Sequence, residues 1–512
     1  MFADEFPFDK IENSAEMTQD LFRFFQNALE NGSTFHDFEE ELWNQLLQVG
    51  NRLTQAFLDA QGFGDLGDRV TLNENQHDEK TVVRLDKMQS RPLRSIFGSF
   101  EIERIVYGTR KGQKIEFVPL DTRLELPESK FSYLLQNWSQ QITTEQPYGQ
   151  VSKVLQSILG FRLHVDSLER MSRKMSPAAE AFCWDRTMPA PEEEGEIVVV
   201  TADGKGVPIR READAPRIYD HQPTRGPKRD RKRMATVASI YSVDRHLRLA
   251  EDVVNALFRT PDSEAKENNK TQRPRPCHKW AYACLDYQDV DDEPISGRLS
   301  AFGWLDQQLK IRVHDCLDEV VLIMDGQESL WEIGQQLESR GVLIEILDLL
   351  HVTPRLWTAA SLFHDAGSDE AEKFVKDRVT KILHGNVSSV IRGLRRLGKL
   401  RKLSNKKAKT LETICTYFEK NKDRMKYDKY LSRGYPIASG VIEGACRHLV
   451  KDRLERTGMT WTRNGAQAML NLRAITIADD WQEFQVNWIE TETVRLYQYK
   501  DALKQQNWAI ST

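Results

Sequence analysis

Five strand-like segments between residues 196 and 347 constrain the fold of this chain more than any other feature. The first, Glu-Ile-Val-Val-Val-Thr-Ala at 196–202, is a continuous apolar run of the kind found in strands that are buried on both faces. It follows a Pro- and Glu-rich stretch at 189–195, which is typical of a boundary between domains. The other expected strands lie at 234–243, 247–254, 320–324 and 342–347.

Helices are expected directly before the fourth and fifth strands, at 300–314 and 329–340. The order is therefore three strands, helix, strand, helix, strand. Strands that follow one another directly can pair antiparallel, whereas a strand reached through a helical crossover runs parallel to its neighbour. We therefore expect an α+β (mixed α/β) chain with a ribonuclease-H-like core, whose first part spans 196–353.

The region before this core is expected to be mostly helical. Acidic residues are concentrated in 1–90, where 34–61 carries Phe and Leu at helical spacing. In 91–188, alternation from Gly98 to Tyr107, followed by a Gly-bounded turn and 115–118, predicts a β-hairpin.

Further helices in the same region are predicted at 131–144, 148–159 and 168–175. Gly160 separates the last two, and basic residues follow it along the third helix. This outline fits a DNA-binding helix-turn-helix, and it equally fits a plain helical hairpin.

Helices are also expected after the core, in an insertion at 354–435 and in a C-terminal part at 436–512. From Lys381 to Lys409 the chain contains many Lys and Arg residues and no Asp or Glu. A second basic cluster occupies 225–233. Such runs neutralise DNA phosphates, and the alternative for each is a solvated loop. The residues of the longer run that we expect to contact DNA are Arg395, Arg396 and Lys399.

Three acidic residues stand where a metal site can form. Asp203 follows the first strand, Asp325 follows the strand 320–324, and Glu443 lies early in a helix expected at 440–456. Carboxylates of this kind suit Mg²⁺, which takes a few oxygen ligands and leaves positions for a substrate. Taken singly, an Asp-Gly after a strand is often only a turn.

The helix that carries Glu443 also places Arg447 and Lys451 at steps of four residues, which puts the three on one face. The two cations would then be placed to hold a phosphate beside the acid. The alternative is a surface ion pair worth a few tenths of a kcal/mol.

Longer segments of the chain resemble a known protein family. The segment Val441-Ile-Glu-Gly-Ala-Cys-Arg-His-Leu-Val-Lys-Asp-Arg to Trp461, continuing through 465–473, resembles the C-terminal signature of ISKra-type insertion-sequence transposases. The segments 202–207, 348–352, 356–360 and 133–171 resemble the same family.

This resemblance implies a DDE transposase of a bacterial insertion sequence. It implies that the enzyme binds terminal inverted repeats, and that it cleaves and joins DNA with two Mg²⁺ ions, for which Mn²⁺ would substitute. Asp203, Asp325 and Glu443 would then be the catalytic, metal-binding acids. A homo-oligomer on transposon ends and target DNA is also implied.

Asp348 competes with Asp325 for the role of second acid, because it too ends a strand. It precedes His351 by three residues, and an Asp or Cys at this distance from a His recurs in related transposase superfamilies. We favour Asp325, because it follows the fourth strand, and we treat Asp348 and His351 as an auxiliary pair.

The net charge of -5 excludes a globally basic nucleic-acid binder, so any DNA contact must be local. No apolar run approaches a membrane span, the N-terminal residues lack a signal-peptide core, and the six cysteines are scattered. We therefore expect a cytoplasmic protein, associated with the nucleoid when it is bound to DNA. The alternative functions are a catalytically silent or domesticated DNA-binding protein and a nuclease without strand transfer.

Overall fold

The computed structural model describes residues 12–75, 78–109, 114–210, 232–258, 273–288, 294–312, 319–337, 342–456 and 458–504. The chain divides into two compact units. Unit 1 comprises residues 1–171 and 482–512, and unit 2 comprises residues 172–481. The five regions expected from the sequence are a finer division and remain a prediction.

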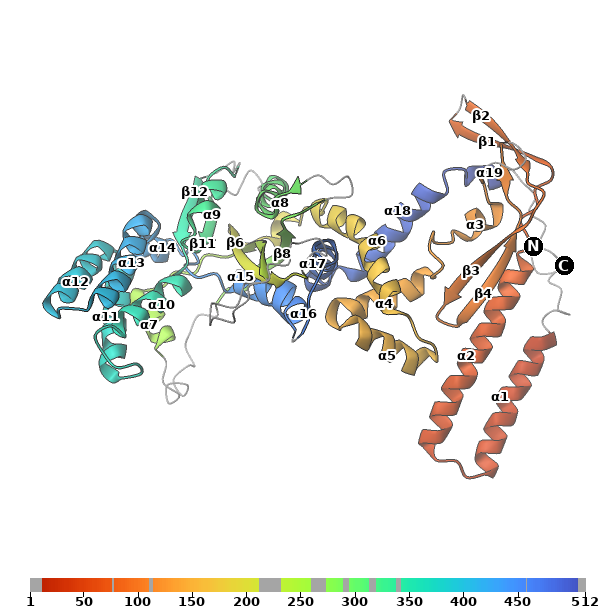
Figure 1. The fold of residues 1–512 in the computed structure, drawn as a ribbon, viewed down its shortest axis with the longest axis horizontal. Coiled ribbons are helices and arrows are strands. Elements are labelled where there is room, and N and C mark those ends of the chain that lie inside the picture. Colours follow the sequence, from red (N-terminus) through yellow and green to blue (C-terminus); the bar gives the residue numbers. More distant parts are fainter. Residues whose placement is uncertain are drawn as a thin grey trace, which may run out of the picture. The chain divides into compact units, whose positions relative to one another are not determined.

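A five-stranded mixed sheet forms the centre of unit 2, with the strand order β12-β11-β6-β7-β8 (Figure 1). β6 and β7 pair antiparallel, as do β7 and β8, whereas β11 runs parallel to both β6 and β12. The strands are β6 (Ile197–Pro208), β7 (Lys232–Val243), β8 (Cys277–Leu285), β11 (Glu319–Met324) and β12 (Val342–Leu347).

Both faces of this sheet are buried. Along β6, Val198 and Val200 contribute to one apolar cluster, and Ile197 and Val199 contribute to the other. Successive strand residues point to opposite faces, so a strand covered on both sides needs the continuous apolar run seen here.

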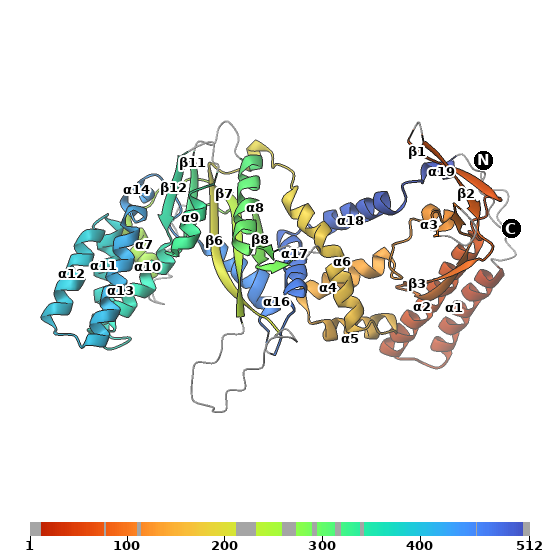
Figure 2. The same ribbon diagram turned by 45° about the horizontal axis from the view of Figure 1, so that its top comes forward.

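Helices cover each face of the sheet (Figure 2). On one side, α8 (Gly297–Arg312) and α9 (Glu328–Gly334) supply the apolar residues. On the other side lie α7 (Ala250–Leu257) and the helical insertion. The insertion consists of α10 (Leu349–Ala360), α11 (Asp369–Leu383), α12 (Val387–Leu400), α13 (Asn405–Asn421) and α14 (Tyr427–Ser432).

The third strand differs from the prediction. Residues expected as a strand at 247–254 instead lead into α7, where Ala250, Val253, Val254 and Leu257 recur at helical spacing. The Asp252 carboxylate accepts a hydrogen bond from the Leu249 amide at 2.9 Å and caps this helix. The true third strand is β8, which was not predicted.

The end of unit 2 is helical, as predicted, but its helix is not uniform. α15 (Gly440–Ala445) passes into a π-helical turn (Cys446–Lys451) and then into α16 (Asp452–Leu454). α17 (Arg463–Ala478) follows and packs against β8.

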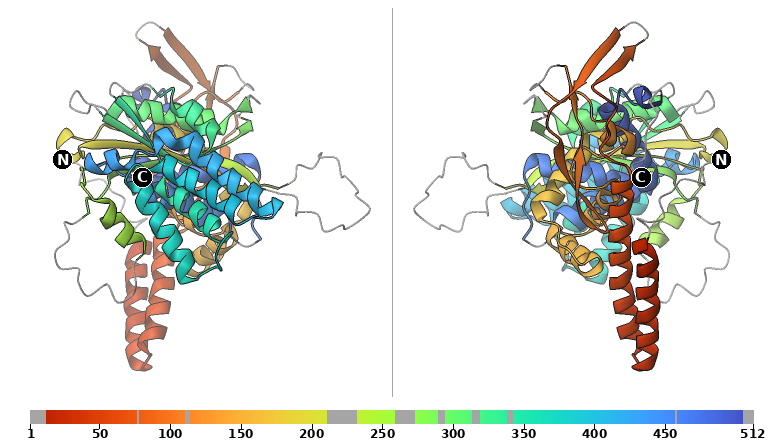
Figure 3. Two further views of the ribbon diagram at one scale, coloured as in Figure 1. Left: turned by 90° about the vertical axis from the view of Figure 1, so that its left-hand side faces the viewer. Right: turned by 90° about the vertical axis from the view of Figure 1, so that its right-hand side faces the viewer.

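Unit 1 begins with two long helices, α1 (Glu12–Glu30) and α2 (Phe35–Ala60), which lie side by side in both views of Figure 3. Thr34 caps α2 by accepting a hydrogen bond from the Asp37 amide at 3.2 Å. The expectation of helix up to residue 90 is wrong beyond Ala60, because β1 (Arg69–Asn75) and β2 (Asp78–Arg84) form an antiparallel hairpin.

The second hairpin of unit 1 joins β3 (Gln89–Ser95) and β4 (Gly98–Arg104). The prediction placed the partner of β4 downstream, at 115–118, whereas the partner lies upstream. The two residues of β5 (Tyr107–Gly108) pair with β2 instead, and Phe117 forms a single bridge to Tyr107.

The helix-turn-helix outline is present in unit 1, but only as local structure. α5 (Tyr148–Leu159) ends at Gly160, whose φ of 73° is left-handed. α6 (Val165–Trp184) is longer than predicted and continues into unit 2. Unit 1 also contains α3 (Pro119–Leu124), α4 (Tyr133–Glu145), most of α18 (Trp481–Leu496) and α19 (Asp501–Lys504).

Candidate active site

Asp203 and Asp325 lie beside each other where two parallel strands of unit 2 stop pairing. The register between β6 and β11 ends with Ala202 opposite Met324, so the next residue of each strand is one of these acids. β6 itself continues to Pro208, because beyond Ala202 it remains paired with β7. The structure therefore brings together the first two acids that the sequence predicted.

The Asp203 carboxylate is half-buried and accepts hydrogen bonds at both oxygens. Oδ1 accepts from the Gly204 amide at 2.7 Å, and Oδ2 accepts from the Cys446 thiol at 3.6 Å. Burial raises the pKa of Asp203, and the negative charge of Asp325 raises it further. Cys446 opens the π-helical turn and was missed by sequence reasoning, which treated the cysteines only as scattered thiols.

Asp325 is held by its own loop. Its Oδ1 accepts a hydrogen bond from the Gln327 amide at 2.9 Å, and its backbone carbonyl accepts one from Trp331 Nε1 at 2.6 Å. Within the described residues, no hydrogen bond to Oδ2 of Asp325 is present. One oxygen of this carboxylate therefore stays available.

Gly326, the residue after Asp325, lies closely against a side chain of the insertion. A Cβ on Gly326 would overlap the ring of Tyr417, which comes from α13 in the insertion. The Arg355 guanidinium of α10 lies 3.6 Å from the centroid of the same ring. The insertion thus braces the loop that carries Asp325.

Asp348 occupies a different environment, although it also follows a strand. Its side chain is buried, with 2% of the residue exposed. Oδ1 accepts from the Leu350 amide at 2.8 Å and caps α10, and Oδ2 accepts from the Ser439 amide at 3.3 Å. Burial raises the pKa of Asp348 to about 6. With both oxygens engaged by backbone amides, Asp348 is less suited than Asp325 to bind a metal.

His351 and Glu443 lie near these acids. The His351 imidazole is close enough to Asp203 and Asp348 to oppose the rise in pKa that burial causes in each. Glu443 is exposed on α15, and its charge raises the pKa of Asp348. Ser439 caps α15 and also donates a hydrogen bond to the Thr201 hydroxyl at 3.2 Å, which fixes the start of that helix against β6.

The acids are gathered in pairs rather than as one triad. Asp203 lies with Asp325, and Asp348 lies within electrostatic range of Glu443. Among the residues that the structure describes, no group of three or more His, Cys, Asp or Glu side chains is spaced to hold a metal ion. The donor chemistry of Asp203 and Asp325 nevertheless fits Mg²⁺, because carboxylate oxygens are its usual protein ligands.

The expected row of Glu443, Arg447 and Lys451 does not keep α-helical spacing. The π-helical turn begins three residues after Glu443 and includes both cations. Its cause is Arg473, a buried side chain of α17. Arg473 donates hydrogen bonds to the backbone carbonyls of His448 and Leu449 (3.0 Å for the latter), which competes with α-helical pairing.

The two cations of this row differ in their partners. Arg447 is exposed and lies 3.5 Å from the Asp452 carboxylate. Lys451 is exposed and forms no ion pair within the described residues.

The three basic residues predicted in the insertion also divide by partner. Arg395 bonds to Glu412 at 2.8 Å and to Glu419 at 3.0 Å, both of which come from α13. Arg396 and Lys399 are exposed on α12 and form no ion pair with any described residue. Of the second basic cluster, 225–231 lies outside the described residues, and Lys232 pairs with Glu455 at 2.5 Å.

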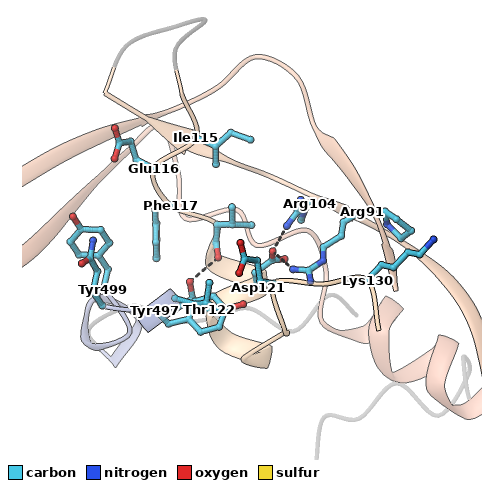
Figure 4. A pocket seen from close by; sticks show the side chains of 15 residues that line it. Arg91, Arg104, Ile115, Glu116, Phe117, Asp121, Thr122, Lys130, Tyr497 and Tyr499 are labelled. Atoms are coloured by element: carbon cyan, nitrogen blue, oxygen red, sulfur yellow. Dashed lines mark hydrogen bonds and ion pairs between the residues drawn. The ribbon is translucent and has the colours of Figure 1, made fainter. Parts of the chain in front are cut away.

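A pocket in unit 1 also carries charged side chains (Figure 4). Arg91 and Arg104 both turn toward the buried Asp121, and Arg91 also donates to the Ser129 carbonyl at 3.0 Å. Both arginines bond to Oδ2 of Asp121, whereas Oδ1 of Asp121 and Nε of Arg104 are buried without a hydrogen-bond partner among the described residues. The lining of this pocket includes none of the acids predicted from the sequence.

Comparison with known proteins gives no family assignment: none of the family models matches the chain, and no curated protein matches it either. Separately, no helix among the described residues is both long and apolar enough to cross a membrane.

Proposed function

We propose that the chain is a DDE transposase of a bacterial insertion sequence, with a ribonuclease-H-like catalytic core in unit 2. The observation that carries this proposal is the pairing of Asp203 with Asp325 at the ends of neighbouring parallel strands. The strand order β12-β11-β6-β7-β8 supports it, because three antiparallel strands followed by two parallel ones is the arrangement expected of that core.

Asp203 and Asp325 would hold the metal, and Glu443 is the proposed third ligand. Each of the two aspartates has a carboxylate oxygen that no backbone amide occupies. Bound Mg²⁺ would supply an activated water or 3′-hydroxyl and stabilise the leaving oxygen of a phosphodiester, with Mn²⁺ as a substitute. Asp348 and His351 would act as an auxiliary pair, since Asp348 is occupied by backbone amides.

The remaining residues would bind DNA. Arg396 and Lys399 of α12 and Lys451 of the π-helical turn are exposed cations that can neutralise backbone phosphates. Arg447 can join them if it exchanges Asp452 for a phosphate. The α5–α6 region would recognise the terminal inverted repeats, and two copies of the chain would hold two transposon ends. We place this activity in the cytoplasm, at the nucleoid.

The test is a Mg²⁺-dependent reaction on DNA that contains the sequences flanking the gene. We expect cleavage with free 3′-hydroxyl ends and products in which those ends are joined to a second DNA. Asp203→Asn and Asp325→Asn should abolish both, whereas Asp365→Asn, which alters an exposed aspartate of the same unit, should not. Glu443→Gln should likewise abolish both, whereas Glu332→Gln, which alters an exposed glutamate of α9, should not.

Other outcomes identify the alternatives. DNA binding without cleavage by the unaltered chain would favour a catalytically silent or domesticated DNA-binding protein. Cleavage without joining would favour a nuclease. Full activity of Asp203→Asn would show that the site is assigned wrongly.

A further inference from the structure

A second pocket in unit 2 lies apart from the paired acids. It has a volume of about 300 Å³ and is formed by the end of β7, the segment 273–276 and the segment 434–441 that leads into α15. Tyr241, Val243, Pro436, Ala438 and Val441 form its apolar part. Its charged lining consists of Arg248, Arg273, Arg275 and Asp244, with His246 beside them.

Among the described residues, the hydrogen-bond partners of Arg248 in this pocket are backbone carbonyls. Its Nε donates to the His246 carbonyl at 3.2 Å, and its Nη2 donates to the Tyr435 carbonyl at 2.7 Å. These bonds orient the guanidinium without neutralising its charge. Burial, and to a smaller extent the nearby charge of Arg273, lower the pKa of Arg248 to about 10.

The positive charge of the pocket is not balanced by the acids around it. Within the described residues, neither Arg248 nor Arg273 forms an ion pair with a carboxylate. Asp252 is the acid whose charge acts on Arg248, but its carboxylate accepts the Leu249 amide as a helix cap. Asp244 also lines the pocket, and its Oδ1 accepts the Glu196 amide at 3.4 Å.

His246 is affected by the same two positive charges. Its pKa is lowered by burial and then by the charges of Arg248 and Arg273. A half-buried, fixed guanidinium beside a second one, with neither in an ion pair among the described residues, is an arrangement suited to phosphate, because the planar fork donates two parallel hydrogen bonds.

We propose that this pocket binds a phosphate group, held by Arg248 and Arg273 over the apolar surface of Tyr241 and Val441. Two sources share this chemistry: a phosphate of the DNA backbone and free inorganic phosphate. Only the DNA source rests on the proposed function. Since Gly440 and Val441 line the pocket, its occupant would lie next to the helix that carries Glu443.

The experiment measures binding by the full-length chain in EDTA, so that no cleavage occurs. One arm titrates inorganic phosphate against chloride at equal ionic strength and follows the heat of binding and the melting temperature. The other arm follows the fluorescence anisotropy of a short labelled DNA duplex over a range of salt concentrations. Arg273→Gln is the main variant, because Arg273 is exposed and a substitution at an exposed position usually changes stability by no more than about 0.5 kcal/mol. Arg298→Gln, an exposed arginine of α8, is the matched control.

If inorganic phosphate is the occupant, it binds the unaltered chain, and Arg273→Gln weakens that binding about tenfold while Arg298→Gln does not. If a DNA phosphate is the occupant, inorganic phosphate binds weakly and Arg273→Gln lowers the slope of log affinity against log salt by about 0.9. Arg248→Lys, which keeps the charge and loses the fork, should reproduce part of either effect.

The proposal is overturned if Arg273→Gln matches Arg298→Gln in both arms. That result leaves the proposed function untouched, because cleavage is measured separately. Conversely, an inactive chain that binds phosphate through Arg273 would refute the transposase and retain the pocket.

Discussion

The Ser439 amide donates a hydrogen bond to the Asp348 carboxylate at 3.3 Å, although the two residues are 91 positions apart in the chain. Asp348 directly follows β12 and caps α10, and Ser439 caps α15. The backbone amide of Asp348 also donates a hydrogen bond to the Met324 carbonyl, at 2.9 Å. Through its carboxylate and its backbone amide together, Asp348 therefore links the ends of β11 and β12 to the helix that carries Glu443.

Replacing this carboxylate should cost stability. We expect Asp348→Ala to lower the free energy of unfolding by about 1–3 kcal/mol, because a helix cap and a buried acceptor are lost together. Asp325→Asn should change it by no more than about 0.5 kcal/mol, since the loop keeps its carbonyl oxygen as an acceptor. Urea denaturation of both variants, together with the DNA cleavage assay, separates the structural acid from the catalytic one. Equal stability losses in the two variants would contradict this division.

The stability of the chain should depend on pH through Asp348. Its folded pKa of about 6 lies above the ordinary value of 3.8, so the folded state holds the proton more tightly than the unfolded state does. Stability should therefore fall as pH rises from about 4 to about 6, since the buried carboxylate ionises there. Asp348→Asn should flatten this part of the profile of unfolding free energy against pH. The same slope in both proteins would show that other groups cause it.

Gly326 and Tyr417 form a second long-range contact that can be tested. Gly326→Ala should destabilise the chain by about 1–3 kcal/mol, because the new methyl group overlaps the Tyr417 ring. Tyr417→Leu should make room for it, so the double variant should lose less stability than the two single losses combined. Thermal unfolding of the four proteins gives the interaction free energy. Additive losses would mean that the ring does not brace this loop.

The basic residues of α12 should contribute unequally to DNA binding. Arg396→Gln and Lys399→Gln should each lower the slope of log affinity against log salt by about 0.9 if each contacts one phosphate. Arg395→Gln should change it less, since Glu412 and Glu419 already occupy that guanidinium. Anisotropy titrations at several salt concentrations measure the three slopes. A larger effect from Arg395 than from Arg396 would reverse the assignment.

Sequence reasoning found two central strands because burial on both faces leaves a direct mark. The runs at 196–202 and 320–324 are apolar over nearly their whole length, and both lie in strands, although β6 continues beyond the prediction to Pro208. β8 was missed because its Cys, His, Lys, Trp and Tyr residues interrupt the apolar run. The third strand was instead predicted at 247–254, where the chain leads into α7. Its pairing with β7 is tertiary and leaves no local signal.

The candidate site, like the sheet, could be predicted only in part from the sequence. The acids at strand ends could be placed, because the carboxyl ends of neighbouring parallel strands lie together. The π-helical turn could not, since it depends on Arg473, a residue 22 positions beyond its end. The partners of Arg395 were likewise hidden, because Glu412 and Glu419 lie just past the acid-free run that drew attention to it.

The course of the chain through its two units has a consequence for synthesis. Unit 1 is completed by residues 482–504, where Tyr499 joins the apolar cluster of β1 and β2 and α19 contacts β1. These residues leave the ribosome only after all of unit 2 has emerged. Part of the apolar surface of the first 171 residues therefore stays uncovered while the residues of unit 2, which include Asp203 and Asp325, are synthesised. A transcript cut short anywhere before residue 482 would yield a chain whose first unit cannot close.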